Sequence, residues 1–368
     1  MGQDTDVFVV GGGPAGLAAA IAARQRGFRV IVADGAKPPI TKACGEGLLP
    51  DAVSALGELG VALRETDGCA FQGIRFEDNR SSVSAGFPEG PGLGVRREIL
   101  HQRMTERARD CGVSLLWNTP VTGLHENGVV AGGNKIQARW VIGADGSRSR
   151  VRRWSGLENL APRRGRFAFR VHYRLGPWCD FTEIHWGEEE QAYVTPVGSQ
   201  EICVVLISNK PDSRFDEILQ RFPKLASRLR GAAQASAERG AVTGMFQLKR
   251  VCRGNVALVG DASGSVDAIT GEGLSLSFKQ ASALAEALAR NDLEGYQKAH
   301  RRLFRRPRLM GHLLLLLDRR GGLRKRSMRA LEAAPQLFER MLAYHLGESR
   351  PLQLATAGAV FGWRFLAT

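Results

Sequence analysis

The sequence lacks the closely spaced cysteine pairs that disulfide-rich domains and zinc sites need. Its 368 residues include only six cysteines, and no two of them form a Cys-x-x-Cys pair. The sequence therefore favours neither a disulfide framework nor a zinc site, and we expect mostly buried, free thiols and no bound metal.

A basic leader and a membrane-spanning run are also missing. The chain passes from MGQDTD directly into the apolar stretch FVV, and the apolar run LMGHLLLLL (309–317) is too short to cross a bilayer. Neither secretion nor a spanning helix is indicated, so we expect a cytoplasmic protein, with association at a membrane surface as a second interpretation. With 43% hydrophobic residues, the chain can bury the cores of two domains or one large core.

Acidic residues are nearly absent from one segment, which carries most of the net charge of +14. Residues 301–329 contain eleven lysines and arginines but a single acid, Asp318. No nucleic-acid recognition module and no basic strand interleaved with aromatics is present, so we expect no nucleic-acid partner. Two interpretations of this segment are kept: a buried helix with a solvated basic face, or a peripheral contact with an anionic membrane.

The N-terminal sequence has the pattern of a βαβ unit. The apolar run TDVFVV (5–10) predicts a buried strand, and GGGPAG (11–16) predicts a loop. The helical pattern LAAAIAARQRG ends at Gly27, and FRVIVAD (28–34) predicts a second strand.

The loop of this unit has the spacing of a dinucleotide-binding turn. Gly11, Gly13 and Gly16 form G-x-G-x-x-G, in which the first glycine permits a tight turn, the second lets the backbone approach a pyrophosphate, and the third allows close helix packing. Ala15 belongs to the same turn, and the helix start supplies free N–H groups for phosphates. Asp34, at the end of the second strand, can accept ribose hydroxyls.

Two later segments repeat the change from an apolar strand to a polar turn. ARWVIGADGSRSRVRR (138–153) places Asp145 at the tip of its turn. GDASGSVDAITGEG (260–273) follows the apolar run NVALVG and precedes a helical pattern, so it predicts a strand, a loop and a helix start.

In this order, the three glycine motifs resemble the para-hydroxybenzoate hydroxylase-type flavoproteins, which include aromatic monooxygenases, flavin halogenases and geranylgeranyl reductases. The resemblance covers about residues 5–290. It implies an α/β fold with a Rossmann-like FAD-binding domain, an antiparallel-sheet substrate domain and a helical C-terminal tail. The implied cofactor is FAD, with Asp145 among the residues that bind it.

The late motif is similar to that of the geranylgeranyl reductase group, G-D-A-A-G-x-x-x-P-x-T-G-E-G. Residues 260–264 read G-D-A-S-G and residues 270–273 read T-G-E-G in the same register, with Ala268 in place of the proline. The resemblance implies that Gly260 and Asp261 contact the cofactor, with Asp261 accepting a ribityl hydroxyl.

The end of this motif begins a helix, which the resemblance places at the flavin ring. Gly271, Gly273 and Leu274 would direct backbone N–H groups at the flavin N1/O2 edge, where negative charge appears on reduction. We expect Glu272 to point away from the ring, into hydrogen bonds that hold the turn.

Two further stretches match the reductase group. KACGEGLLP (42–50) is similar to K-x-C-G-x-G-L, which implies that Cys44 lies near the flavin ring on the substrate side, although a lone loop cysteine is often structural. VRREILHQRMTERARDCG (95–112) resembles the R-x-x-L helix of the family, whose arginine approaches the dinucleotide, and Arg97 is the matching residue.

Four segments between the second and third motifs alternate polar and apolar residues and predict an antiparallel sheet over the flavin: RFAFRVHYRL (166–175), FTEIHW (181–186), QAYVTPV (191–197) and EICVVLIS (201–208). Tyr193 matches a tryptophan of the W-x-F-P pattern of reductases, so it either contacts substrate or fills the core. The halogenase pattern W-x-W-x-I-P is not matched. We expect scaffold roles for His172 and His185.

The predicted domains follow from these motifs. The FAD-binding domain comprises residues 1–165 and 246–295, with 68–95 assigned to it or to the substrate region. The substrate domain comprises 166–245, and a basic helical region comprises 296–368.

The resemblance implies an FAD-dependent oxidoreductase, and three functions are kept. The favoured one is reduction of an alkene in a lipophilic prenyl or polyketide-like substrate by hydride from flavin N5, with a proton from Cys44 or water. The second is a single-component monooxygenase that hydroxylates or epoxidises a hydrophobic or aromatic substrate, and the third is a flavoprotein redox partner. Without a second dinucleotide motif, the electron donor is either NAD(P)H, binding transiently, or a reduced electron carrier such as a ferredoxin.

Overall fold

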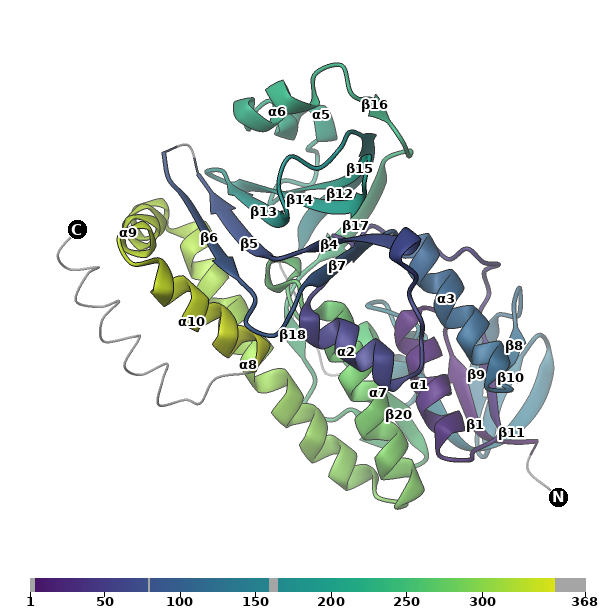
Figure 1. The fold of residues 1–368 in the computed structure, drawn as a ribbon. Helices are drawn as coiled ribbons and strands as arrows, with labels where there is room; N and C mark the ends of the chain where they lie inside the picture. Colours follow the sequence, from purple (N-terminus) through teal and green to yellow (C-terminus); the bar gives the residue numbers. More distant parts are fainter. Residues whose placement is uncertain (1–3, 79, 159–164, 348–368) are drawn as a thin grey trace.

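A mainly parallel sheet forms one half of the fold (Figure 1). The computed structural model describes residues 4–78, 80–158 and 165–347. The strand order is β19-β20-β11-β1-β2-β8, and antiparallel β10 and β9 extend from β11. The strands are β1 (Thr5–Val10), β2 (Val30–Ala33), β8 (Ser114–Leu116), β9 (Val121–His125), β10 (Gly128–Ala131), β11 (Asn134–Gly143), β19 (Cys252–Arg253) and β20 (Val256–Leu258).

Helices α1 (Pro14–Gln25), α3 (Arg97–Asp110) and α7 (Gly273–Ala289) accompany this sheet, with α1 packed between the other two. The predicted βαβ unit is confirmed, and β1 has the predicted bounds. The helix begins earlier than its apolar pattern because Pro14 occupies its first turn, where proline needs no N–H partner. The short helix α2 (Pro50–Glu58) follows β3 (Gly47–Leu48), and the short helix α4 (Arg150–Trp154) follows β11.

A second sheet lies above the first in Figure 1 and has the order β16-β12-β15-β14-β13-β5-β6, with β17 also paired to β12. The four predicted strands are confirmed within two residues at each end and pair antiparallel. The strands are β5 (Gly73–Glu77), β6 (Ser82–Gly86), β12 (Arg166–Arg174), β13 (Phe181–Trp186), β14 (Glu190–Gly198), β15 (Glu201–Ser208), β16 (Ala233–Gln234) and β17 (Arg239–Thr243).

Part of the 68–95 segment joins this second sheet. β5 pairs parallel with β13 and antiparallel with β6, so the sheet is mixed at this edge. β4 (Gly68–Phe71) and β7 (Gly92–Val95) instead form a small antiparallel sheet with β3 (Gly47–Leu48). β18 (Phe246–Gln247) pairs with β21 (Gly264–Ser265), and α5 (Phe215–Leu219) and α6 (Pro223–Leu229) pack on the second sheet. The domain boundaries themselves stay a prediction.

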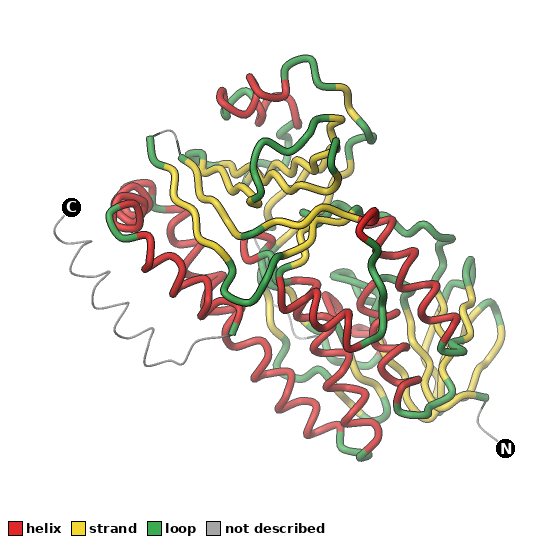
Figure 2. The backbone as a smooth tube through the Cα atoms, in the orientation of Figure 1, coloured by secondary structure: helices red, strands yellow, loops and turns green. Residues whose placement is uncertain are grey.

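The C-terminal region is helical, as predicted, up to residue 347, where the described part of the chain ends. It consists of α8 (Leu293–Arg319), which continues through Pro307, α9 (Gly321–Glu332) and α10 (Pro335–Leu346). Figure 2 shows these helices running from the first sheet to the edge of the second, and α9 and α10 pack against β6. The ring of Phe338 stacks on Phe76 of β5 with their centroids 4.7 Å apart. Residues 348–368 of the predicted tail lie outside the described part.

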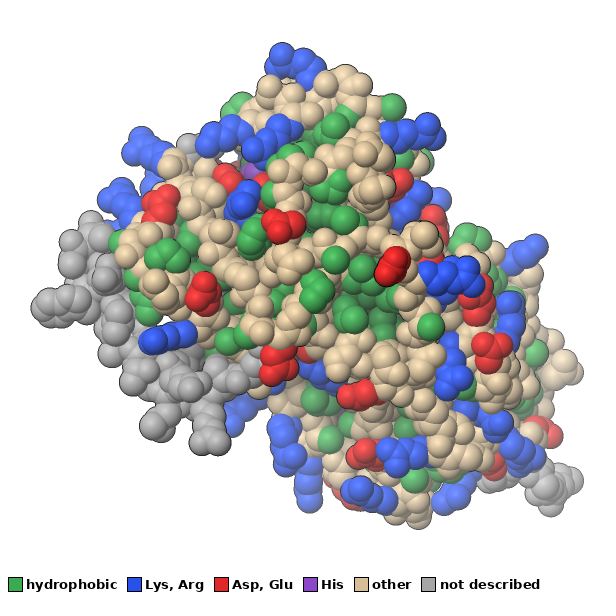
Figure 3. All heavy atoms as spheres, in the orientation of Figure 1, with side chains coloured by type: hydrophobic (Ala, Val, Ile, Leu, Met, Phe, Trp, Pro, Cys, Tyr) green, Lys and Arg blue, Asp and Glu red, His purple; other side chains and the backbone are tan. Residues whose placement is uncertain are grey.

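The leucine-rich run of α8 has both a buried and an exposed face. Leu314 is buried, whereas Leu309, Leu313 and Leu316 are 44–46% exposed. Figure 3 shows lysine and arginine side chains around much of the outline of one face, with hydrophobic side chains toward its middle. Within residues 4–78, 80–158 and 165–347, no helix combines the length and the apolar character needed to cross a membrane.

The six cysteines are all free thiols. Only Cys203 and Cys252 are buried, so the prediction of mostly buried thiols is wrong for the other four, which are half-buried.

A buried polar network ties the C-terminal helices to the second sheet. Arg166 on β12 forms ion pairs with Asp267 and with Asp318 on α8. Asp318 also accepts a hydrogen bond of 2.7 Å from the Gln191 side chain on β14. Each charge is buried but has an opposite charge beside it, which is the condition under which buried ions are tolerated.

We expect Asp318→Ala to lower the free energy of unfolding by about 3 kcal/mol, because it leaves Gln191 without its acceptor and removes one of the two acids at Arg166. Glu286→Ala, which breaks an exposed ion pair with Arg26, serves as the control and should cost less than about 1 kcal/mol. Urea denaturation measures both values. Equal losses in the two variants would show that the network contributes nothing beyond a surface ion pair.

Candidate functional site

A cavity of about 810 Å³ lies where the loops of the first sheet face the second sheet. It is lined by the three glycine motifs, the Cys44 loop and alternate residues of the second sheet. All but two of the predicted site residues contribute to its wall: Gly11, Gly13, Ala15, Asp34, Cys44, Arg97, Asp145, Tyr193, Asp261, Gly271, Gly273 and Leu274. Gly16 and Gly260 lie behind the wall.

In the first turn, Gly11, Gly13 and Gly16 differ in what surrounds them. Gly11 has φ of +110°, and an added Cβ would lie 2.5 Å from the Ala144 carbonyl oxygen. A Cβ on Gly16 would lie 1.8 Å from the Gly11 carbonyl oxygen, whereas a Cβ on Gly13 would meet no protein atom within 4 Å. Gly11 and Gly16 are therefore required by packing, and Gly13 leaves room beside the start of α1 for a ligand.

The Asp34 carboxylate holds this turn from the end of β2. Its two oxygens accept hydrogen bonds from the backbone N–H groups of Gly12, at 2.7 Å, and Ala36, at 2.8 Å. Each carboxylate oxygen has a further lone pair, so a ribose hydroxyl can still donate to it.

Asp145 has a structural task in the middle motif. Its carboxylate accepts hydrogen bonds from the Ser149 hydroxyl, at 2.5 Å, and from the Arg150 backbone N–H, at 2.7 Å, and so holds the start of α4. Its predicted contact with the cofactor stays a prediction.

The late motif packs directly against the first. Gly260 has φ of +57°, and a Cβ there would lie 2.6 Å from the Ala15 Cβ. Asp261 forms an ion pair of 2.9 Å with Lys42, which joins this turn to the Cys44 loop. Gly271, with φ of +68°, ends a short 3-10 turn, and α7 then begins with its first residues in the cavity wall.

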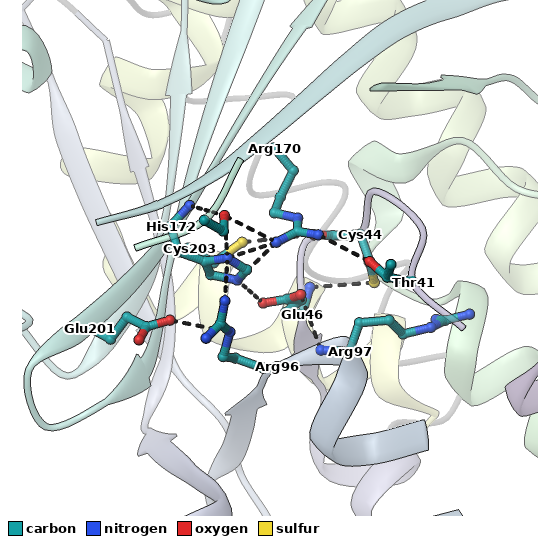
Figure 4. Close-up of polar contacts among 10 residues, drawn as sticks. Thr41, Cys44, Glu46, Arg96, Arg97, Arg170, His172, Glu201 and Cys203 are labelled. Carbon is teal, nitrogen blue, oxygen red and sulfur yellow. Dashed lines mark hydrogen bonds and ion pairs between the residues drawn. The ribbon is translucent and has the colours of Figure 1, made fainter. Parts of the chain in front are cut away.

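The Cys44 loop is anchored by Glu46, which also lines the cavity and whose polar contacts are drawn in Figure 4. The Cys44 sulfur accepts a hydrogen bond of 3.4 Å from the Glu46 backbone N–H. Glu46 has φ of +59°, an uncommon value for a residue with a side chain. Its carboxylate accepts hydrogen bonds from the His172 ring, at 2.5 Å, and from the Arg97 backbone N–H, at 3.1 Å.

The His172 ring is held in one tautomer by its neighbours. Arg170 lies 2.6 Å from Nδ1, the Ser236 hydroxyl 2.9 Å and Arg96 3.3 Å. Arginine can only donate, so Nδ1 accepts and Nε2 carries the proton that is donated to Glu46. His172 is a scaffold residue, as predicted, and the part that it supports, through Glu46, is the Cys44 loop.

One group of possible metal ligands lies at this position. Glu46, His172 and Cys203 have ligand atoms within 4.8 Å of one another. Burial raises the pKa of the Cys203 thiol well above its usual value, and the Arg170 guanidinium lies 2.6 Å from Nδ1 of His172. A neutral thiol beside a fixed positive charge is a poor site for a cation, so we do not assign a metal here.

Arg97 supplies a donor from the start of α3. Its side chain lines the cavity, and its Nε is buried without a hydrogen-bond partner among the described residues. A guanidinium with a free donor in a cavity that two helix N-termini enter fits an anionic dinucleotide. The residues present therefore fit FAD, with Gly13, Asp34 and Arg97 as the residues that would hold it.

The second sheet contributes an apolar wall opposite these groups. The strand register aligns Ile184, Tyr193 and Val205 in one row across β13, β14 and β15, and all three line the cavity. The Tyr193 hydroxyl donates a hydrogen bond of 2.6 Å to Gln191, and burial raises the pKa of the phenol above its usual value.

The alternate residues of β13 point away from the cavity. His185 forms a buried ion pair of 3.0 Å with Glu183, and neither residue lines the wall. Burial alone would raise the pKa of Glu183, but hydrogen bonds from His185 and Trp178 lower it to about 2. His185 is therefore a scaffold residue, as predicted.

Sequence reasoning did not single out Glu46, Lys42 or the row partners of Tyr193. Glu46 and Lys42 belong to the stretch that identifies the Cys44 loop, but their partners are 126 and 219 residues away. The period-two pattern could have found Ile184 and Val205 only with the register known.

We expect Gly13→Ala and Gly16→Ala to fail in different ways. Gly13→Ala should change the free energy of unfolding of the apoprotein by less than about 0.5 kcal/mol but weaken FAD binding at least tenfold, because its methyl group occupies space a pyrophosphate needs. Gly16→Ala should destabilise the apoprotein by about 2 kcal/mol, because its methyl group collides with Gly11. Thermal unfolding and FAD fluorescence titration measure these effects. Normal FAD affinity in Gly13→Ala would refute its assignment.

Comparison with known proteins identifies the family of the chain. Residues 4–302 match the model of a family described as FAD binding domain. The chain is 29% identical to a menaquinone reductase of Mycobacterium tuberculosis, over 79% of this chain and 78% of that protein. It is 26% identical to a digeranylgeranylglycerophospholipid reductase of Thermoplasma acidophilum, over 83% of this chain and 85% of that protein.

A solved structure shows the same fold. A flavoprotein/dehydrogenase from Cytophaga hutchinsonii superposes with a TM-score of 0.80 at 20% sequence identity, covering 93% of this chain and 92% of that one. The predicted resemblance to the geranylgeranyl reductase group, the α/β fold and the FAD cofactor are confirmed. The chain belongs to the FAD binding domain family and is an FAD-dependent oxidoreductase.

Proposed function

We propose that this oxidoreductase reduces a carbon–carbon double bond in the prenyl chain of a lipophilic substrate. The observation that carries the proposal is the apolar row Ile184, Tyr193 and Val205, together with Phe71 and Ile74, in the same cavity as the dinucleotide-binding turns. An apolar wall facing a redox cofactor suits a hydrocarbon chain better than a charged metabolite. The relatives named as reductases of menaquinone and of digeranylgeranylglycerophospholipid support a prenylated substrate.

The reaction needs a hydride and a proton on neighbouring carbons. Reduced FAD supplies the hydride when bound. The chain supplies the proton: the Cys44 S–H bond breaks as a C–H bond forms at the second carbon, and the thiolate then regains a proton from solvent. The backbone N–H of Glu46, already directed at the sulfur, stabilises the transient thiolate.

Tyr193 orients the substrate in this scheme and transfers no proton. Its phenol donates to Gln191, and burial keeps it neutral over the working pH range. The ring then provides a flat contact surface beside Ile184.

The electron donor in our proposal is NAD(P)H or a reduced electron carrier. The described ranges contain one glycine-rich βαβ turn of the dinucleotide type, at α1, and we assign it to FAD. NAD(P)H would therefore bind transiently at the open side of the cavity. The two donors can be distinguished by mixing the oxidised protein with NADPH or with reduced ferredoxin and monitoring flavin reduction by the loss of its visible absorbance.

We expect the anaerobically reduced enzyme to convert menaquinone or digeranylgeranylglycerophospholipid in detergent to a product heavier by two hydrogens, detected by mass spectrometry. Cys44→Ser should slow this single turnover by roughly a hundredfold, because a hydroxyl is a much weaker acid than a thiol. Cys111→Ser, which changes a half-buried thiol at the end of α3, is the matched control.

Two results would contradict the proposal. Incorporation of ¹⁸O from ¹⁸O₂ into the product would identify a monooxygenase. Flavin oxidation by other electron carriers without conversion of any prenyl substrate would identify a redox partner.

We also propose that α8 contacts an anionic membrane surface, from which a cytoplasmic enzyme could take a lipid-soluble substrate. Leu309, Leu313 and Leu316 are spaced on one helical face and are exposed. Arg305 and Arg308, which come just before Leu309 in α8, are exposed as well. Exposed leucines beside arginines form the pattern of an interfacial helix.

We expect wild-type protein to float with liposomes that contain anionic lipid, and a triple Leu309→Ser, Leu313→Ser, Leu316→Ser variant to lose most of this binding. Val242→Ser removes a similarly exposed apolar side chain from β17 and should not affect flotation. Unchanged flotation of the triple variant would exclude the α8 face as the contact.

A further inference from the structure

The last turn of α10 returns to the late glycine motif. His345 is buried, and its Nε2 lies 2.9 Å from the Thr270 carbonyl oxygen. A carbonyl oxygen only accepts hydrogen bonds, so Nε2 carries a proton and donates it. The opposite ring nitrogen, Nδ1, is then the atom that faces the next residues of the motif.

Nδ1 of His345 faces the Glu272 carboxylate. The distance from Nδ1 to Oε2 is 3.5 Å. Both atoms are buried, and neither has a hydrogen-bond partner elsewhere in the described residues. Without a proton between them they would be two buried acceptors directed at each other, which is strongly unfavourable; one shared proton removes the conflict.

The other charged groups around Glu272 have partners of their own. Asp51 on α2 accepts hydrogen bonds from Ser275 and from Lys279, the latter at 2.6 Å. Arg306 on α8 donates to the Tyr344 carbonyl oxygen at 3.3 Å. Burial raises the pKa of Glu272, and the attraction of His345 opposes this shift only in part. Glu272 thus depends on His345 for a direct partner.

Glu272 precedes the first residue of α7, whose start lies in the cavity wall. Gly271 and Gly273 line the cavity, whereas the Glu272 side chain turns away from it, toward α10. A helix N-terminus stabilises negative charge that develops on a ligand in front of it. An unneutralised carboxylate at the same helix start would cancel this effect.

We propose that His345 is a positioning residue for a proton on Glu272, and that the shared proton keeps the start of α7 free of net negative charge. The pair thereby holds the reduction potential of bound FAD independent of the ionisation of Glu272. The inference requires FAD binding but not a particular substrate.

The test is the midpoint potential of bound FAD, measured by dye equilibration between pH 5.5 and 9. The informative variant is His345→Gln, whose side-chain amide can still donate to Thr270 but offers Glu272 no titrating partner. At low pH its potential should equal that of wild type, because Glu272 is protonated. At pH values above the raised pKa of Glu272, this carboxyl group is ionised in the oxidised variant. Reduction of the flavin is then accompanied by the uptake of one additional proton.

The expected signature is a steeper pH dependence in His345→Gln only. One additional proton changes the reduction equilibrium tenfold per pH unit, which is about 30 mV per pH unit for a two-electron couple. Glu272→Gln and the double variant should both follow the wild-type curve, since neither has a carboxylate to ionise. His185→Gln, in the buried His185–Glu183 pair away from the cavity, is the matched control.

Two outcomes would overturn the inference. A wild-type pH dependence in His345→Gln would show that His345 does not set the proton on Glu272. A potential in Glu272→Gln well above that of wild type would show that the wild-type carboxylate is not neutralised. The second comparison holds even where His345→Gln fails to fold, and neither depends on conversion of a prenyl substrate.

Discussion

The structure depends on close packing between three glycine motifs that are far apart in the sequence. Gly16 lies against the Gly11 carbonyl, Gly11 lies against the Ala144 carbonyl, and Gly260 lies against Ala15. A larger residue at Gly11 or Gly16 would displace the backbone, and one at Gly260 would collide with the Ala15 side chain. Because of these contacts, the N-termini of α1 and α7 enter the same cavity, so that one helix can face a phosphate group and the other a redox-active ring.

The sequence pattern within a short segment was sufficient to predict those elements of the fold that depend only on neighbouring residues. The βαβ unit and strands β12 to β15 follow from periodicity and turn residues, and their bounds are nearly those predicted. The parallel pairing of β5 with β13 could not be predicted, because it joins segments about a hundred residues apart and local alternation does not specify a partner.

The same distinction applies to the candidate site. Glycine spacing located Gly11, Gly13, Gly271 and Gly273, because backbone requirements leave a mark in the sequence. The side chains that support the site leave none: Glu46 meets His172, and Glu272 meets His345, only after the chain has folded. The sequence predicted that Glu272 turns away from the ring, but the identity of its partner required the structure.

The order of strands in the first sheet bears on how the protein is made. β11 lies between β1 and β20, so β1 has no neighbour on that side until residue 143 has been synthesised. β11 in turn has no neighbour on its other side until residue 258 has been synthesised. β5 and β6 likewise precede β13 by about a hundred residues. Such long-range pairing folds slowly and leaves strand edges exposed meanwhile. A nascent chain of this protein should therefore need chaperone protection until α7 has left the ribosome.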